Sequence, residues 1–233
     1  MIRGMPRVSL ARAVGLTAKR ALDIAAAVAV GLVTAPLLCL IALAVRWTSP
    51  GPAIFWQPRV GKGSRVFILC KFRTMTDARG PDGRLLLDRD RLTAVGRFLR
   101  KTSLDELPQL WNVLRGELSL VGPRPLPIHY YPYFTDRERL RHGVKPGITG
   151  WAQVNGRNEA SWDRRLAADV WYAENWSFAL DLRILLATVA AVLQRRGVVV
   201  DPRSTMLNLD EERRGRETAA RPDQGNGRTR CLT

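Results

Sequence analysis

The sequence predicts an α+β protein that is mainly helical, with a small β-hairpin or sheet and an N-terminal membrane helix. Three observations support this prediction. Residues 21–45 form a long apolar segment, two short alternating runs flank a glycine turn, and later segments carry helical apolar stripes. The chain has 233 residues, enough for one compact domain with an appendage.

The apolar segment is predicted to stay in the membrane. It is longer than the apolar region of a secretory signal peptide, and no small-residue cleavage site follows it. Pro36 removes one helical hydrogen bond and should kink the helix into arms of about 14 and about 10 residues, which reach roughly 21 and 15 Å. Neither arm crosses a hydrocarbon core of about 30 Å. A kinked spanning helix and a helix that dips in and returns both fit, and the basic residues on both sides give no orientation.

Local patterns predict the elements that follow. They are a hairpin of strands 53–57 and 66–72, an exposed loop 77–90, and helices over 92–99, from Ser103 or Asp105 to Gly116, over 160–175 and over 179–194. The last helix is too short to span a membrane, so it is either a buried core helix or an interfacial one. Residues after Arg203 are polar and are expected to be disordered.

The charge balance indicates an anionic partner. Thirty-seven Lys and Arg against 21 Asp and Glu give a net charge of +16. The three cysteines stand far apart and there are only two histidines, which argues against a disulfide scaffold or a structural zinc site and fits a reducing cytosolic setting. A nucleic-acid-binding protein would carry a basic helix or an aromatic platform, and the sequence has neither motif. Phosphate-bearing substrates and acidic lipid headgroups remain as partners, unless part of the arginine excess reflects compositional bias alone.

Two adjacent carboxylates, Asp105 and Glu106, follow a run of basic residues. One interpretation is structural, because the segment from Ser103 to Glu106 has the S-x-x-E form of a capping box. Pro108 fits that register poorly, since it would fall at the fifth helical position; with Asp105 as the N-cap it would lie in the free first turn. The other interpretation is catalytic, because a helix start beside cations favours phosphate.

Other motifs also suggest phosphate or carboxylate recognition. Prolines on both sides of Arg124 hold its backbone extended and pre-position its guanidinium, unless it is simply an arginine in a stiff surface loop. Residues 145–157 combine turn glycines with Gln153 and Arg157, and they either line a ligand pocket or form a hairpin. Residues 71–75 are a further cationic patch.

In this order the motifs resemble those of the bacterial sugar transferases, also called monotopic phosphoglycosyl transferases, in the short form that lacks extra N-terminal membrane helices. The resemblance covers about residues 19–197. The motifs that carry it are Lys19-Arg20-Ala21-Leu22-Asp23, Ser49-Pro50-Gly51-Pro52, Lys71-Phe72-Arg73-Thr74-Met75, Arg100-Lys101-Thr102-Ser103-Leu104-Asp105-Glu106-Leu107-Pro108-Gln109-Leu110, Gly122-Pro123-Arg124-Pro125 and Lys145-Pro146-Gly147-Ile148-Thr149-Gly150.

The resemblance implies a re-entrant membrane helix broken at Pro36. It also implies that Asp105 is a nucleophile that attacks the sugar-bearing phosphorus and that Glu106 helps to hold Mg²⁺, with Asp105 as the second metal-binding carboxylate. Cations and a metal are needed there, because a carboxylate that attacks a diphosphate approaches negative charge. The predicted substrate-binding residues are Lys71, Arg73, Arg100, Arg124, Gln153 and Arg157.

The predicted organisation is a basic N-terminal segment (1–18), the membrane helix (19–47), a cytosolic catalytic domain (48–202) and a disordered tail (203–233). The resemblance implies a protein of the bacterial inner membrane, seated on its cytoplasmic face. Its expected reaction is transfer of a sugar-1-phosphate from a nucleotide sugar, with UDP as the expected nucleotide, to polyprenol phosphate, as the first step of polysaccharide, including exopolysaccharide, or glycan biosynthesis. Anionic membrane lipids are expected partners, nucleic acid is not, and homodimer formation is left open. A non-catalytic membrane scaffold is the rival interpretation, and it gives the two carboxylates no role beyond capping.

Overall fold

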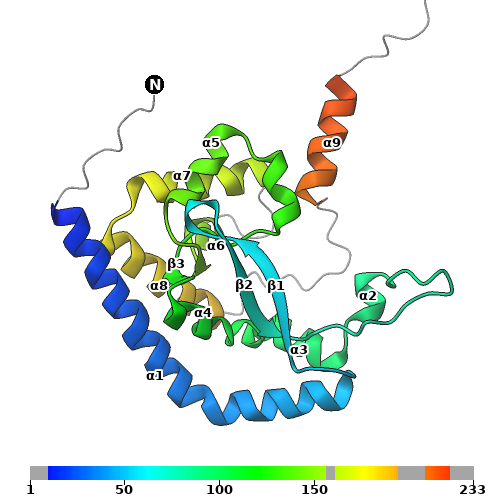
Figure 1. Ribbon diagram of the computed structural model, residues 1–233. Helices are drawn as coiled ribbons and strands as arrows, with labels where there is room; N and C mark the ends of the chain where they lie inside the picture. Colours follow the sequence, from blue (N-terminus) through cyan, green and yellow to red (C-terminus); the bar gives the residue numbers. More distant parts are fainter. Residues whose placement is uncertain (1–9, 156–160, 194–207, 221–233) are drawn as a thin grey trace, which may run out of the picture.

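The computed structural model describes residues 10–155, 161–193 and 208–220, and it confirms a mainly helical α+β architecture with small sheets (Figure 1). The elements in chain order are α1 (Leu10–Thr48), β1 (Ile54–Val60), η1 (Lys62–Ser64), β2 (Val66–Phe72), α2 (Asp88–Arg91), α3 (Ala94–Thr102), η2 (Leu104–Glu106), α4 (Gln109–Arg115), β3 (Ser119–Val121), η3 (Ile128–Tyr133), α5 (Asp136–Arg139), η4 (Leu140–Gly143), β4 (Gly147–Thr149), α6 (Trp151–Asn155), α7 (Trp162–Asn175), α8 (Phe178–Leu193) and α9 (Leu209–Ala220).

The apolar N-terminal segment forms one long helix, α1, which bends as it passes around the body of the protein (Figure 1). Pro36 lies inside α1, so the expected break is a bend within a continuous helix rather than a gap between two helices. Next to it, Leu32 and Val33 are 72% and 81% exposed. The segment Ala13–Thr48 is long and apolar enough to cross a membrane, and little of it is buried against the protein.

Charged residues near the start of α1 dock this helix onto the rest of the protein. The Lys19 ammonium contacts the buried Asp181 carboxylate at 2.6 Å, and Arg20 donates to main-chain carbonyls in α4. The buried Asp23 carboxylate accepts from the Ser119 hydroxyl at 3.1 Å and from the main chain of β3 at 3.0 Å. These contacts account for charged side chains beside an apolar segment, because each buried charge has a polar partner.

The predicted hairpin is confirmed. Strands β1 and β2 pair antiparallel from Ile54 opposite Phe72 to Val60 opposite Val66, with the glycine turn between them. Helix α4 packs on β2 through the buried Asn112, whose amide donates to the Ile68 carbonyl at 2.7 Å and accepts from the Cys70 amide at 3.0 Å. The side chain thus pairs with two main-chain groups of the strand and fixes α4 beside it.

A short parallel pair, β3 and β4, joins two of the sequence motifs. Gly122 and Gly147 lie where the backbones of the two segments approach closely: a Cβ on Gly122 would come within 2.3 Å of the Lys145 carbonyl oxygen. Strand β4, within residues 145–150, therefore pairs in parallel with β3, the strand that leads into the Arg124 loop. Because this partner is a remote, parallel strand, the hairpin alternative for this stretch is wrong. Helices α7 and α8 pack behind this pair.

Helix α8 has one buried and one exposed face. Ile184 and Asp181 are buried, whereas Leu186 and Val189 are exposed. The buried face agrees with the prediction of a core helix, and the exposed face is also apolar, as the interfacial alternative requires.

The tail differs from its prediction. Residues 209–220 form α9, whose Leu209 is fully buried in a cluster with Tyr130, Phe134, Trp162 and Leu166. The expectation of disorder is wrong for this segment, because one leucine and a set of arginine ion pairs supply the contacts that polar composition concealed. The other parts of the predicted tail, 203–207 and 221–233, lie outside the described residues.

Candidate active site

The two carboxylates lie on a 3-10 turn between two helices. Ser103 ends α3 with a φ of +57°, in the left-handed region. Asp105 and Glu106 lie in η2, a 3-10 helix with Ser103 at its N-cap position, so a helical turn does begin next to Ser103. The α-helix itself, α4, begins only at Gln109, later than either predicted start. Pro108 takes the N-cap position of α4, where its missing N–H is not needed. Among the described residues the Ser103 side chain makes no capping hydrogen bond, and the capping-box interpretation is therefore wrong.

Asp105 is buried among opposite charges. Only 9% of the Asp105 surface is exposed to solvent. Burial and the neighbouring Glu106 raise the pKa of Asp105 above its usual range, while the positive charges of Lys71, Arg100 and Arg124 oppose that rise. A carboxylate in this setting is poorly solvated and close to cations, which suits a group that must meet a phosphate.

Glu106 is held by the arginine of the proline-rich loop. The Arg124 guanidinium forms a two-pronged ion pair with the Glu106 carboxylate, through Nη2 with Oε1 and through Nη1 with Oε2 at 3.5 Å. The Arg124 side chain is about half exposed, so its outer face is open to a ligand. The structure thus brings the carboxylate motif and the Gly-Pro-Arg-Pro motif together.

Lys71 reaches the same place from β2. Its Nζ lies 5.5 Å from the centre of the Phe55 ring on the paired strand. Burial, with Arg59 and Arg100 nearby, lowers the pKa of the Lys71 ammonium. Arg100 comes from α3, and its Nε donates to the Thr74 hydroxyl at 3.0 Å, just beyond the end of β2.

Arg59 belongs to the same cluster and was not predicted. Burial, together with the charge of Arg124, lowers the pKa of Arg59 to about 10, and Glu106 is among the groups that oppose this change. Its Nη2 donates to the Gln57 side chain at 2.6 Å. The register of the hairpin could have predicted this position. Arg59 and Phe55 are four residues apart and share a face of β1, and Phe55 pairs with Lys71, so Arg59 lies on the same face of the hairpin as Lys71.

The structure does not bring every predicted residue to this cluster. The Arg73 guanidinium instead donates to the Pro50 carbonyl at 2.8 Å and to Asp77 at 3.3 Å, which ties down the turn after α1. Gln153 lies in α6 and donates to the Ile148 carbonyl at 3.4 Å. Substrate binding by these two residues stays a prediction. Arg157 lies outside the described residues.

The donor set fits Mg²⁺ as a cation shared with a phosphate substrate. The described chain holds no group of three or more His, Cys, Asp or Glu that could bind a metal by themselves. Mg²⁺ commonly uses one or two carboxylates and completes its shell with phosphate oxygens and water. The adjacent Asp105 and Glu106 supply that number of carboxylates.

Comparison with known proteins gives concordant matches. The family model described as bacterial sugar transferase matches residues 14–195. An uncharacterized sugar transferase, EpsL, of Bacillus subtilis is 52% identical over 180 residues, which are 77% of this chain and 89% of that protein. The UDP-glucose:undecaprenyl-phosphate glucose-1-phosphate transferase of Caulobacter vibrioides is 45% identical over 75% of this chain and 69% of its own length. The undecaprenyl-phosphate galactose phosphotransferase of Salmonella typhimurium is 40% identical over 77% of this chain but only 41% of its own length.

Proposed function

Because the chain belongs to the bacterial sugar transferase family and is a transferase, we propose that it moves a sugar-1-phosphate from a UDP-sugar to polyprenol phosphate. The observation that carries the proposal is the buried Asp105 beside the Glu106–Arg124 pair, with Lys71 and Arg100 directed to the same turn. The names of the relatives support the substrate class, a nucleotide sugar and undecaprenyl phosphate. The product would begin the repeat unit of a polysaccharide or glycan.

In the first step, an oxygen of the Asp105 carboxylate attacks the phosphorus that bears the sugar. A bond forms between that oxygen and phosphorus, and the bond from phosphorus to the bridging oxygen of the diphosphate breaks, so UMP leaves. The surrounding cations offset the negative charge that meets there, and they do so in a poorly solvated site where electrostatic interactions are strong. Asp105 then carries the sugar phosphate as an acyl phosphate.

In the second step, a phosphate oxygen of the acceptor lipid attacks the same phosphorus. The bond to Asp105 breaks, the carboxylate is restored, and polyprenol diphosphate sugar is released. Arg124 orients Glu106 and offers its exposed face to phosphate oxygens. Asp105 and Glu106 would hold Mg²⁺, which would neutralise phosphate charge when bound.

We further propose that α1 enters the cytoplasmic leaflet of the inner membrane and returns. The exposed apolar side chains around the Pro36 bend support this topology, and so do the contacts that fix the first part of α1 to the catalytic domain. Single cysteines at Arg12→Cys and Asn208→Cys, with the native cysteines removed, would test it. Neither should react with an impermeant thiol reagent applied to intact cells, and labelling of either one would refute the re-entrant topology.

The chemical proposal is tested with the detergent-extracted full chain and a panel of nucleotide sugars that includes UDP-glucose and UDP-galactose. Without acceptor, about one equivalent of UMP per active enzyme should appear. Asp105→Asn should lower turnover at least about a thousandfold, which corresponds to roughly 4 kcal/mol of barrier. Asp136→Asn, the same change at a fully exposed carboxylate, should have no effect.

The outcomes separate the reaction from its route. If no nucleotide sugar releases nucleoside monophosphate in the presence of undecaprenyl phosphate, the proposed reaction is wrong. If release occurs only with acceptor, or if Asp105→Asn remains active, the reaction stands and the covalent route is wrong.

A further inference from the structure

A buried ion pair lies behind the candidate active site. Arg141 in η4 and Asp169 in α7 are 2% and 4% exposed. The Arg141 Nε and Nη2 atoms lie 3.1 and 2.5 Å from the same oxygen, Oδ2, of Asp169. Neither residue belongs to the group of cations and carboxylates described above, so the pair needs another explanation.

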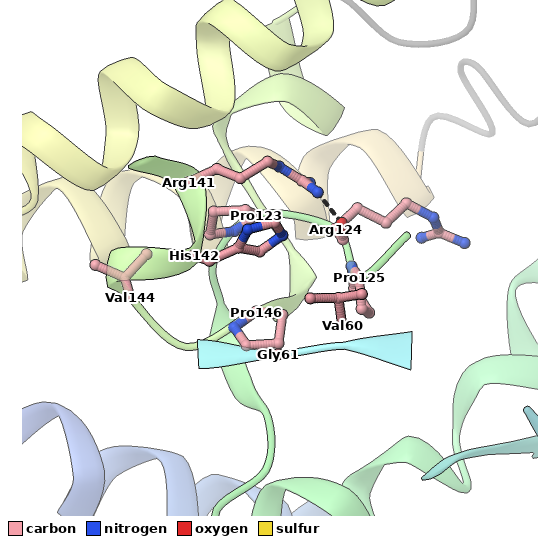
Figure 2. A pocket seen from close by; sticks show the side chains of 9 residues that line it. All are labelled: Val60, Gly61, Pro123, Arg124, Pro125, Arg141, His142, Val144 and Pro146. Atoms are coloured by element: carbon pink, nitrogen blue, oxygen red, sulfur yellow. Dashed lines mark hydrogen bonds between the residues drawn. The ribbon is translucent and has the colours of Figure 1, made fainter. Parts of the chain in front are cut away.

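The same guanidinium makes a second contact, to the main chain of the active-site loop. Arg141 Nη2 donates to the main-chain carbonyl of Arg124 at 2.6 Å, the dashed line in Figure 2. In that view Arg141 approaches the Arg124 carbonyl from one side, and the Arg124 guanidinium points away on the other. Arg141 therefore links α7 to the peptide group that carries Arg124.

This contact completes the restraint of the loop. The Gly122 amide donates to the Thr149 carbonyl at 2.8 Å, and the Pro123 carbonyl accepts from the Gly147 amide at 3.0 Å. The next carbonyl is that of Arg124, beyond the reach of the β3–β4 pairing, and its donor is a side chain. With proline φ angles fixed on both sides, the loop has little backbone freedom left.

Stability is a weak reason for this arrangement. Burial raises the pKa of Asp169 even though Arg141 lies beside it, which indicates that the pair does not fully offset the loss of solvation. Buried ion pairs are often no more stable than apolar residues of the same volume. What a planar guanidinium adds is geometry, because it donates in fixed directions to two acceptors at once.

We infer that Arg141, oriented by Asp169, is a positioning residue: it fixes the main chain of Arg124 so that the Arg124 guanidinium meets Glu106 and the phosphates of the donor. The inference rests on the proposed function for the identity of the ligand. It assigns Arg141 no contact with the substrate. Its effect on the reaction passes through Arg124 alone.

A double-mutant cycle tests this route. Initial rates of UMP release from UDP-glucose, with undecaprenyl phosphate present, are measured for the parent chain, Arg141→Lys, Arg124→Ala and the double variant. A displacement of about 1 Å in a catalytic group can lower activity about a hundredfold, so Arg141→Lys should lose roughly 10- to 100-fold in the parent chain. In the Arg124→Ala background the same change should lower the rate less than about twofold. Arg139→Lys, a partly exposed neighbour, is the matched control and should leave the rate unchanged.

Each result decides the inference. An equal loss from Arg141→Lys in both backgrounds would mean that Arg141 acts through general packing, and it would overturn the positioning role while leaving Arg124 in the active site. An Arg124→Ala variant with full activity would overturn the role of Arg124 in the proposed function, and the inference with it. If Arg141→Lys does not accumulate as folded protein, Asp169→Asn replaces it in the cycle, since it keeps the volume and removes the orienting charge. A fully active Asp169→Asn would then refute the inference.

Discussion

Gly122→Ala should damage both stability and activity, because it forces two paired segments apart. A Cβ at this position would lie 2.3 Å from the Lys145 carbonyl oxygen and 2.9 Å from the Gly147 amide nitrogen. Ordinary contacts of a Cβ begin at 3.4 Å. Both neighbours are main-chain atoms, so no side-chain rotation relieves the clash, and β3 and β4 must separate by about 1 Å.

That separation sets the expected magnitudes. Overpacking of this kind costs about 1–3 kcal/mol of unfolding free energy. For a chain of this length each kcal/mol lowers Tm by roughly 2–4 °C. Gly122 lies two residues before Arg124, so a shift of about 1 Å should also displace the guanidinium and lower turnover by about a hundredfold.

Thermal unfolding and UMP release from UDP-glucose, both on the detergent-extracted full chain, measure the two effects. Gly143→Ala is the matched control, since its added Cβ would have no heavy atom of the described residues within 4 Å apart from its chain neighbours and the backbone of its own helix. It should keep activity and change stability by no more than about 0.5 kcal/mol. If Gly122→Ala matched the parent chain in both assays, the close approach of β3 and β4 would not be what positions Arg124.

Three further predictions follow from buried groups. The raised pKa of Asp105 means that its ionised form destabilises the folded state above that pKa, so Asp105→Asn should raise Tm at pH 8. The gain should vanish as pH falls below about 4, and an unchanged or lower Tm at pH 8 would contradict this. Leu209→Ala should lower the free energy of unfolding in urea by about 2–4 kcal/mol, whereas a change at the exposed Thr218, Thr218→Ala, should alter it by no more than about 0.5 kcal/mol. Equal stability of the two variants would support the original prediction of a disordered tail. Lys19→Met leaves the buried Asp181 without its cation and should cost about 3–5 kcal/mol in the same assay, with part regained in the Lys19→Met/Asp181→Asn double variant; additive losses would show that the two residues are not coupled.

Local patterns in the sequence were sufficient for several elements. The alternating runs around the glycine turn predicted the hairpin, and the apolar stripe in 160–175 predicted α7, because side-chain periodicity reports which face of a single element is buried. The same reasoning placed a bend in the membrane segment at Pro36, since the missing amide is a property of one residue. It also singled out Asp105 and Arg124, each from its immediate neighbours in the chain.

Contacts between distant segments were decided only by the tertiary structure. Local patterns can predict a hairpin between neighbouring strands, but they do not show which remote strands pair. The parallel pairing that brings Arg124 to Glu106, 18 residues away in the chain, was therefore not predictable from them. Arg73 fits a phosphate site by charge alone, yet packing commits it to a turn. The docking of Leu209 depends on a pocket built from two other segments, residues 126–134 and helix α7, so a polar composition concealed it. Residue type and spacing determined the chemistry available to this protein, and long-range packing decided which of those groups meet, because contact energies between remote segments exist only after the chain has folded.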